Sequence, residues 1–324
     1  MSAVLVTGAG GFVGLALVEA LLARGETVTT LDAAPLTEAA RACFAALPGR
    51  LQPVLADARD AAALQDAMAG ADRMIIAAAV TAGPAREMAA PEHILSVNVQ
   101  AVATAVRLAA AAGLRRVVHL SSGAAYGGAD ASEPVLVEDA PLRPTALYGI
   151  SKAAGEAVAL RLSALGGLDL VAARLGTCFG PWEHATGLRD TLSPQWQILQ
   201  AALRGEEAVL PRDSVRDWLY VRDAAAGLLS LLDRPALPHR VYNVGTGITW
   251  PLSDFCRSLA AVRPGFAWRV GEPGTIATHT ERSAASVARL LADTPFRPSF
   301  GAAEAVRDWL AFHAHFPAAL HARG

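Results

Sequence analysis

Tyr148 and Lys152 are the residues whose types and spacing most directly suggest chemistry. They lie four positions apart in the run Tyr148-Gly149-Ile150-Ser151-Lys152, which places the phenol and the ammonium on one face of a helix. A free tyrosine is a poor base at neutral pH, but a neighbouring cation favours the phenolate. Tyr148 is therefore a candidate general base for a substrate hydroxyl, although the pair alone also fits a capping tyrosine beside a solvated lysine.

Two serine hydroxyls lie at the end of an expected strand. Ser121 and Ser122 follow the apolar run Val117-Val118-His119-Leu120, which predicts a strand over residues 115–120. The carboxyl ends of strands form the sheet edge where α/β proteins bind ligands, so both hydroxyls are candidate site groups. His119 lies inside the apolar run, and we interpret it as a satisfied core histidine rather than a catalyst.

A glycine loop follows the first expected strand. The segment from Thr7 to Gly14 reads TGAGGFVG and leads into a helix rich in Ala and Leu. Glycines here allow a tight turn and a close approach to a pyrophosphate, while the start of the helix supplies donors and positive potential. We assign to this dinucleotide loop the residues Gly8, Gly11, Phe12, Val13 and Gly14.

Two acids at later strand ends extend the cofactor prediction. Asp32 lies where a carboxylate accepts hydrogen bonds from an adenosine ribose, and it favours NAD over NADP because a 2′-phosphate would meet negative charge. Asp57 ends the third expected strand and is a candidate for the adenine amino group, with a solvated acid as the equal alternative. The neighbouring strand-end residues Ala58, Ala77 and Ala78 complete this set.

Short apolar runs alternate with Ala/Leu/Glu-rich segments, as in β-α-β units around a parallel sheet. We expect an α/β fold: a Rossmann-type doubly wound parallel sheet with a smaller, interleaved C-terminal substrate lobe. The sheet domain covers residues 1–174 plus about 215–245, and the lobe covers about 175–214 and 246–324. Expected strands cover residues 3–7, 26–31, 51–56, 72–78, 115–120 and 168–174, with helices between them, a further helix at 194–204 and a strand-helix unit at 218–232.

The composition narrows the class of partner. The net charge of −2 and the absence of a basic run argue against nucleic acid. Three distant cysteines support neither a disulfide framework nor a metal site. We find no apolar run near the roughly 18 residues of a membrane span, Met74–Ala85 being the nearest, and no secretory signal. We therefore expect a cytoplasmic protein that binds a small molecule and no metal.

Six ordered motifs together resemble the extended short-chain dehydrogenase/reductase family, in its NAD-dependent epimerase/dehydratase branch. They are the Gly8–Gly14 loop, Asn98-Val99, the segment from Ser121 to Gly127, Tyr148 with Lys152, and residues 216–223 and 242–245. The resemblance implies NAD as the cofactor and catalysis by Ser122, Tyr148 and Lys152. It also implies support from Ser121, a grip of Lys152 on the ribose, and a structural role for Asn98, which we place with the cofactor site.

The resemblance further implies a homodimer. The family's usual dimer uses two long helices, and the segments His93–Ala112 and Ala146–Leu165 are long and apolar on more than one face. It also places Thr81, Trp182 and Arg189 over the cleft. The residues expected to contact substrate are Thr81, Ser122, Tyr148, Thr177, Arg189 and Arg216.

Departures from the family pattern bear on the substrate. Gly123-Ala124 stand where the branch's dehydratases carry Asp-Glu, which argues against dehydration. Thr177 replaces an Asn of sugar-nucleotide epimerases. Arg216 matches their diphosphate-binding arginine, but Glu272-Pro273-Gly274-Thr275 replaces Arg-Pro-Gly-Asp, so half of that clamp is missing unless Arg282 substitutes.

Three functions follow from these residues. The first is a sugar or sugar-nucleotide 4-epimerase that works through a transient 4-keto intermediate, supported by Arg216. The second is a dehydrogenase of a smaller polyhydroxylated substrate, such as a sugar acid or lactone, favoured by Thr177 and Glu272. The third is a non-catalytic dinucleotide sensor, against which the intact Ser122, Tyr148 and Lys152 argue.

Overall fold

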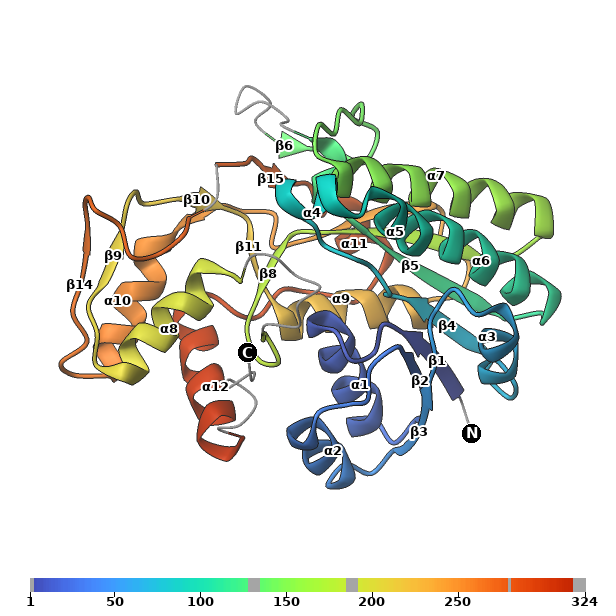
Figure 1. Ribbon diagram of the computed structural model, residues 1–324, viewed down its shortest axis with the longest axis horizontal. Coiled ribbons are helices and arrows are strands. Elements are labelled where there is room, and N and C mark those ends of the chain that lie inside the picture. Colours follow the sequence, from blue (N-terminus) through green and yellow to red (C-terminus); the bar gives the residue numbers. More distant parts are fainter. Residues whose placement is uncertain (1–2, 128–134, 185–191, 279–280, 317–324) are drawn as a thin grey trace.

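A seven-stranded parallel sheet forms the centre of the molecule (Figure 1). The computed structural model describes residues 3–127, 135–184, 192–278 and 281–316. The strand order is β12-β7-β5-β4-β1-β2-β3. The chain adds β2 and β3 on one side of β1 and then β4, β5, β7 and β12 on the other, as in a doubly wound sheet. The strands are β1 Ala3–Thr7, β2 Thr27–Asp32, β3 Arg50–Leu55, β4 Arg73–Ile76, β5 Arg116–Ser122, β7 Leu170–Leu175 and β12 Val241–Val244.

The sequence predicted six of these strands and missed β12. Apolar residues of the strands alternate between two hydrophobic clusters, one on each face of the sheet, because successive side chains of a strand point to opposite faces. In β1, Val4 and Val6 join the cluster that includes the helices Phe12–Ala23 (α1) and Val221–Asp233 (α9). Leu5 joins the cluster that includes the helices Ala61–Ala67 (α3) and Ala101–Ala111 (α6). Burial on both faces explains why the inner strands β1, β4, β5 and β7 are mostly apolar, whereas the edge strand β3 is partly exposed. The flanking helices are α1 Phe12–Ala23, α2 Glu38–Ala45, α3 Ala61–Ala67, α6 Ala101–Ala111, α7 Leu147–Gly166 and α9 Val221–Asp233.

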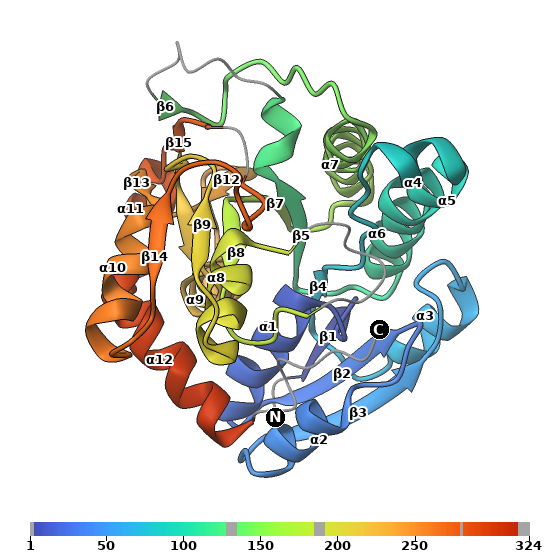
Figure 2. The same cartoon turned by 60° about the vertical axis from the view of Figure 1, so that its left-hand side comes forward.

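The two long apolar helices predicted from the sequence pack against each other. One is continuous from α5 (Pro91–Leu95) through a π-helical turn, η1 (Ser96–Gln100), into α6, and the other is α7. Figures 1 and 2 show them side by side on one face of the sheet. The stretch Pro91–Ala111 is long and apolar enough to cross a membrane, which a count of uninterrupted apolar residues did not reveal. Half of its apolar window is nevertheless buried in the protein, as in a core helix.

A smaller lobe is built mainly from the C-terminal part of the chain (Figure 1). Its helix α8 covers Pro194–Arg204, as predicted, and β11 (Trp218–Tyr220) with α9 forms the expected strand-helix unit. An aromatic core holds the lobe together, with Phe179 5.4 Å from Tyr220 and 5.9 Å from Phe255 between ring centroids. The remaining elements are α4 Pro84–Ala89, η2 Gly123–Tyr126, β6 Val135–Leu136, β8 Thr177–Phe179, β9 Ala208–Leu210, β10 Val215–Arg216, β13 Trp250–Pro251, α10 Leu252–Val262, β14 Trp268–Val270, β15 Ala284–Ala285, α11 Ala288–Asp293 and α12 Ala302–His315.

The lobe and the sheet share one continuous hydrophobic cluster. Trp182 is a clear link, because its ring lies 5.6 Å from Phe44 of α2 and 4.8 Å from Phe312 of α12. Its indole nitrogen donates to Glu19 of α1 at 2.6 Å. Trp182 is therefore a buried packing residue, and the expectation that it contacts substrate is wrong.

Candidate active site

The glycine loop between β1 and α1 has no room for a side chain at Gly8 or Gly14. Gly8 has a φ of +67°, and a Cβ built there would lie 2.5 Å from the backbone nitrogen of Ala78. A Cβ on Gly14 would lie 2.2 Å from the carbonyl oxygen of Gly8. Helix α1 then begins at Phe12 without a side-chain cap, as expected of a helix start that faces a pyrophosphate. The loop therefore fits the dinucleotide role assigned to it.

Asp32 lies against this loop at the end of β2. Its carboxylate accepts hydrogen bonds from the backbone nitrogen of Gly10 at 2.9 Å and of Ala34 at 3.1 Å. These contacts fix the carboxylate at the carboxyl edge of the sheet, beside the glycines. This is the placement that ribose recognition requires, because the ribose is attached to the pyrophosphate that the loop would hold.

The adenine end of the expected cofactor site gives a mixed result. Asp57 forms an ion pair with Arg59 at 2.6 Å, and the hydrogen bond from that guanidinium lowers the pKa of the Asp57 carboxyl. The structure thus gives Asp57 a partner within the protein, and its contact with adenine stays a prediction. Ala58 and Ala78 line a small hollow whose other walls are Thr7, Leu64, Ile76, Val97, Ala101, Val102 and Ala105. Its mostly apolar walls suit the flat face of a base.

Asn98 ties the loop after β4 to α7. Its side chain accepts from the backbone nitrogen of Val80 at 2.8 Å and donates to the Val80 carbonyl at 3.0 Å and to Ser151 Oγ at 2.9 Å. It is fully buried within the π-helical turn η1. These contacts agree with the structural role that the resemblance implied, and they engage Asn98 within the protein rather than toward the cofactor.

The three expected catalytic residues belong to β5 and α7, which pack against each other. Ser122 is the last residue of β5, and its Oγ accepts from the backbone nitrogen of Ala124 at 3.1 Å. Tyr148 is in the first turn of α7 and Lys152 one turn later. The first turn of α7 lies close to η2, since a Cβ on Gly149 would be 2.6 Å from the Ala124 carbonyl oxygen. The fold therefore brings all three residues to one region of the sheet edge.

Burial shapes the charge of this region. Lys152 donates to the carbonyl of Leu120, and burial lowers the pKa of its ammonium to about 8, while Glu156 acts in the opposite direction. Lys152 therefore remains mostly protonated at neutral pH. His119 is buried as predicted, but neither ring nitrogen has a hydrogen-bond partner among the described residues, so it is not a satisfied histidine. Burial, together with the Lys152 charge, lowers the pKa of His119 well below its usual value.

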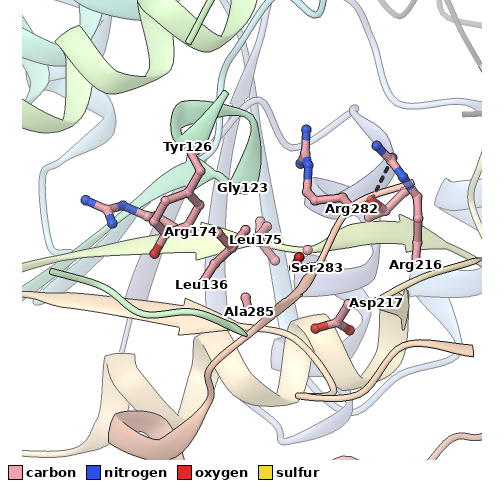
Figure 3. A pocket seen from close by; sticks show the side chains of 12 residues that line it. Gly123, Tyr126, Leu136, Arg174, Leu175, Arg216, Asp217, Arg282, Ser283 and Ala285 are labelled. Carbon is pink, nitrogen blue, oxygen red and sulfur yellow. Dashed lines mark hydrogen bonds between the residues drawn. The ribbon is translucent and has the colours of Figure 1, made fainter. Parts of the chain in front are cut away.

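A pocket with about 340 Å³ of empty space, part of it open to solvent, lies beside Gly123, the residue after Ser122, and is shown in Figure 3. It runs from Tyr126 and Arg174, past Gly123, to Arg282 and Arg216. Arg216 of β10 donates to Thr177 Oγ1 at 3.3 Å. Burial lowers the pKa of the Arg216 guanidinium to about 9, and the charges of Arg282 and Arg212 act in the same direction. The lining residues are Gly123, Tyr126, Leu136, Arg174, Leu175, Gly176, Thr177, Arg216, Asp217, Arg282, Ser283 and Ala285.

The other end of the pocket carries a closed polar network that the sequence did not predict. Arg174 pairs with Glu156 through contacts of 3.0 and 2.6 Å and also donates to the carbonyl of Glu138. The Tyr126 hydroxyl donates to Asn243 Oδ1 at 2.7 Å, and the Arg174 guanidinium lies 4.8 Å from the Tyr126 ring centroid. The residue types gave no local signal, because the partners come from four different elements.

The remaining predicted contacts have separate outcomes. Thr177 and Arg216 line the pocket, whereas Thr81 follows Val80 and is not among the lining residues. Arg189 lies outside the described residues. Glu272 accepts from the backbone nitrogen of Gly274 at 3.0 Å and does not line the pocket, while Arg282 does. The part of the chain that the structure describes holds no group of three His, Cys, Asp or Glu side chains suited to a metal.

Comparison with known proteins agrees with this geometry. The family model described as "NAD dependent epimerase/dehydratase family" matches residues 4–245. The chain belongs to that family. Its sheet, its glycine loop and the residues Ser122, Tyr148 and Lys152 all lie within the matched region. NAD is accordingly its cofactor, and Gly8, Gly14 and Asp32 form the part of the site best shaped to hold it.

Similar proteins include both epimerases and dehydratases. The chain is 32% identical to a dTDP-glucose 4,6-dehydratase of Streptomyces griseus over 76% of its length and 74% of the relative's. It is 29% identical to a UDP-glucose 4-epimerase of Mycolicibacterium smegmatis, over 79% and 81%. The solved structure of MoeE5 in complex with UDP-glucuronic acid and NAD is 28% identical, with a TM-score of 0.76 over 97% of this chain and 99% of that one. The chain is thus similar to enzymes of sugar-nucleotide metabolism.

Proposed function

We propose that this protein is an NAD-dependent 4-epimerase of a nucleotide sugar. One observation carries the proposal: a single pocket joins the Gly123 turn, next to Ser122, to the buried cation of Arg216. The first end suits proton chemistry on a sugar hydroxyl, and the second suits a diphosphate. Arg212 lies within electrostatic range of Arg216, so positive charge persists there although Glu272 replaces the family's arginine.

Each catalytic side chain has a defined task in this mechanism. Ser122 and Tyr148 bind the oxygen of the reacting carbinol, and Tyr148 takes its proton and later returns it. Lys152, buried one helical turn from Tyr148, supplies the cation that favours the phenolate. Gly8, Gly14 and Asp32 would hold NAD, which would supply a reversible hydride acceptor for the carbinol carbon.

The residue types that follow Ser122 support our proposal that the protein does not catalyse dehydration. In place of the acidic pair of the branch's dehydratases, this chain has Gly123 and Ala124. Neither residue has a side chain that can act as acid or base, and Ala124 contributes its backbone nitrogen to Ser122 Oγ. We therefore propose that the keto intermediate is reduced again rather than losing water, although a dehydratase is among the similar proteins.

A net dehydrogenase of a sugar acid or lactone is the second candidate. Thr177 at the pocket wall, where sugar-nucleotide epimerases have Asn, favours this smaller substrate. The two functions share every catalytic residue but differ in the fate of the cofactor. NAD stays bound in an epimerase and leaves after each turnover in a dehydrogenase.

Denaturing extraction of the purified protein separates the two candidates. We expect near-stoichiometric NAD(H), together with a uridine or other nucleotide sugar identified by mass spectrometry. The Tyr148→Phe variant should lose about 10²- to 10⁴-fold in epimerase activity while it retains NAD, because only the proton acceptor is removed. A protein that purifies empty and binds NAD weakly would favour the dehydrogenase, and full activity of Tyr148→Phe would exclude the mechanism.

We also propose a homodimer and a cytoplasmic location. Ile150 and Leu165 of α7 are 42% and 64% exposed, and Leu95 of α5 is 40% exposed, although α7 and α6 pack together. A second copy would cover these apolar side chains. Sedimentation of the NAD-loaded protein should give twice the monomer mass.

A further inference from the structure

Arg282 reaches the pocket from a strand pairing that brings distant parts of the chain together. It lies two residues before β15, which pairs in parallel with β6, and Ser286 donates to the Leu136 carbonyl at 2.8 Å. A Cβ built on Gly123 would lie 3.3 Å from Arg282 Nη1, so the glycine lets the guanidinium lie close against this turn. Figure 3 shows Arg282 between the Gly123 turn and Arg216. The guanidinium is thus adjacent to the turn that Ser122 begins.

Arg282 has no counter-ion within the described parts of the chain. Neither a hydrogen bond nor an ion pair joins its guanidinium to another described residue. Burial lowers the pKa of Arg282, and the Tyr148 phenol acts in the opposite direction. The acid in the pocket wall, Asp217, is engaged by the backbone nitrogens of Thr246 and Gly247 at 2.9 and 3.3 Å. A half-buried cation without a partner favours the binding of an anion.

We propose that Arg282 binds a carboxylate on the reacting sugar, and that the substrate class is therefore a uronic acid in its nucleotide-linked form. The nucleotide part of this statement rests on the proposed function. The carboxylate part does not, because it depends only on the position of Arg282 beside Gly123 and Ser122. A guanidinium matches a carboxylate well, since it donates two parallel hydrogen bonds to the two oxygens.

The geometry of a pyranose ring separates the two arginines. The carbon oxidised at Ser122 and Tyr148 is C4, and its neighbour C5 carries the C6 substituent. The diphosphate is attached to C1, on the opposite side of the ring. A cation next to the Ser122 turn therefore lies on the C4 side of the ring, within reach of the C6 group, whereas Arg216, at the far side of Arg282 in Figure 3, is left for the diphosphate. A neutral hydroxymethyl at C6 would leave the Arg282 cation unpaired, which provides discrimination.

Four probes measured by calorimetry on the NAD-loaded protein test this inference: UDP-glucuronate, UDP-glucose, UDP and free glucuronate. We expect the wild-type protein to bind UDP-glucuronate about 100-fold more tightly than UDP-glucose. Arg282→Met should reduce this ratio to about threefold or less without weakening UDP, and Arg282→Lys should restore part of it. Arg216→Met is the matched control, because it should weaken UDP and both nucleotide sugars alike.

Two results would overturn the inference. One is equal binding of UDP-glucose and UDP-glucuronate by the wild-type protein, a comparison that needs no variant. The other is a loss of UDP affinity in Arg282→Met as large as in Arg216→Met, which would make Arg282 part of the diphosphate site. If UDP does not bind but free glucuronate binds through Arg282, the nucleotide-sugar function fails while the carboxylate site stands.

Discussion

The two ends of the pocket both carry arginine, but they differ in what the protein offers each guanidinium. Arg174 is closed into a network with Glu156 and the Glu138 carbonyl. Arg282, at the other end, has no such partner among the described residues and lies beside a glycine. A satisfied buried charge fixes structure, and an unsatisfied one is available to a ligand. We therefore assign a role in stability to Arg174 and a role in substrate recognition to Arg282, and each assignment can be tested.

Removal of Arg174 should have the largest effect on stability. Arg174→Met leaves Glu156 as an uncompensated buried carboxylate, which costs about 3–5 kcal/mol of unfolding free energy. Urea unfolding checks this value, and the double variant Arg174→Met/Glu156→Leu should recover much of the loss because no charge remains unpaired. Arg282→Met serves as the control, with little loss of stability, because no described residue pairs with that guanidinium. Equal destabilisation by both single variants would remove the distinction between the two ends.

Gly123→Asp should occupy the Arg282 guanidinium with a carboxylate of the protein itself. A Cβ at this position lies 3.3 Å from Arg282 Nη1, so the new carboxylate can pair with that guanidinium in place of the substrate. We expect a loss of about 100-fold in kcat/KM for a carboxylated sugar nucleotide, and no gain of dehydratase product.

Gly123→Ala is the control for this variant. It adds the same Cβ without the charge, and the flexible Arg282 side chain can shift by a few tenths of an ångström, so only a few-fold loss is expected. If alanine were as damaging as aspartate, lost space rather than charge would explain the effect, and the role of Arg282 would be weakened.

Substitution of Lys152 should have a smaller effect on the unfolding free energy, and this effect should depend on pH. Its pKa in the folded protein is about 8, below its ordinary value of 10.5, so the unfolded chain binds more protons between these pH values. The unfolding free energy contributed by Lys152 therefore rises as pH increases from about 8 to about 10.5. Lys152→Met removes this penalty, and should be more stable than the wild-type protein at pH 7 by about 1–3 kcal/mol.

Urea unfolding of the NAD-free proteins at pH 7 and pH 10 measures this difference. The gap between Lys152→Met and the wild-type protein should narrow at the higher pH, since all other titrating groups are common to both. A gap that is the same at both values would mean that Lys152 is not a buried, protonated amine at neutral pH.

Periodicity and short motifs predicted most of the sheet and the cofactor edge. The inner strands β1, β4, β5 and β7 are mostly apolar and buried, and the glycine loop, Asp32 and the Tyr148–Lys152 pair each depend on residues that are close in sequence. Strand β12 was missed because it is only four residues long and contains the buried polar Asn243, so no apolar run marks it.

The substrate end could not be predicted in the same way. Arg282 reaches Gly123 only because two-residue strands, β6 and β15, pair across about half of the chain, and strands this short carry no pattern. Likewise, the network of Arg174, Glu156 and Asn243 depends on side chains that meet only after the sheet has formed. Long-range contacts of this kind are set by topology rather than by local sequence.

The packing of Trp182 has a consequence for how the molecule comes apart. This indole joins Phe44 of the sheet domain to Phe312 of the lobe within one hydrophobic cluster. The lobe therefore lacks a separate core that could unfold or move independently of the sheet domain. In hydrogen exchange, the slowly exchanging amides of α8, α9 and α1 should open together in a single cooperative event. In such an enzyme Arg282 and Arg216 are held at a fixed spacing before the substrate binds. The nucleotide sugar then binds to a preformed site, without closure of the lobe on the sheet domain.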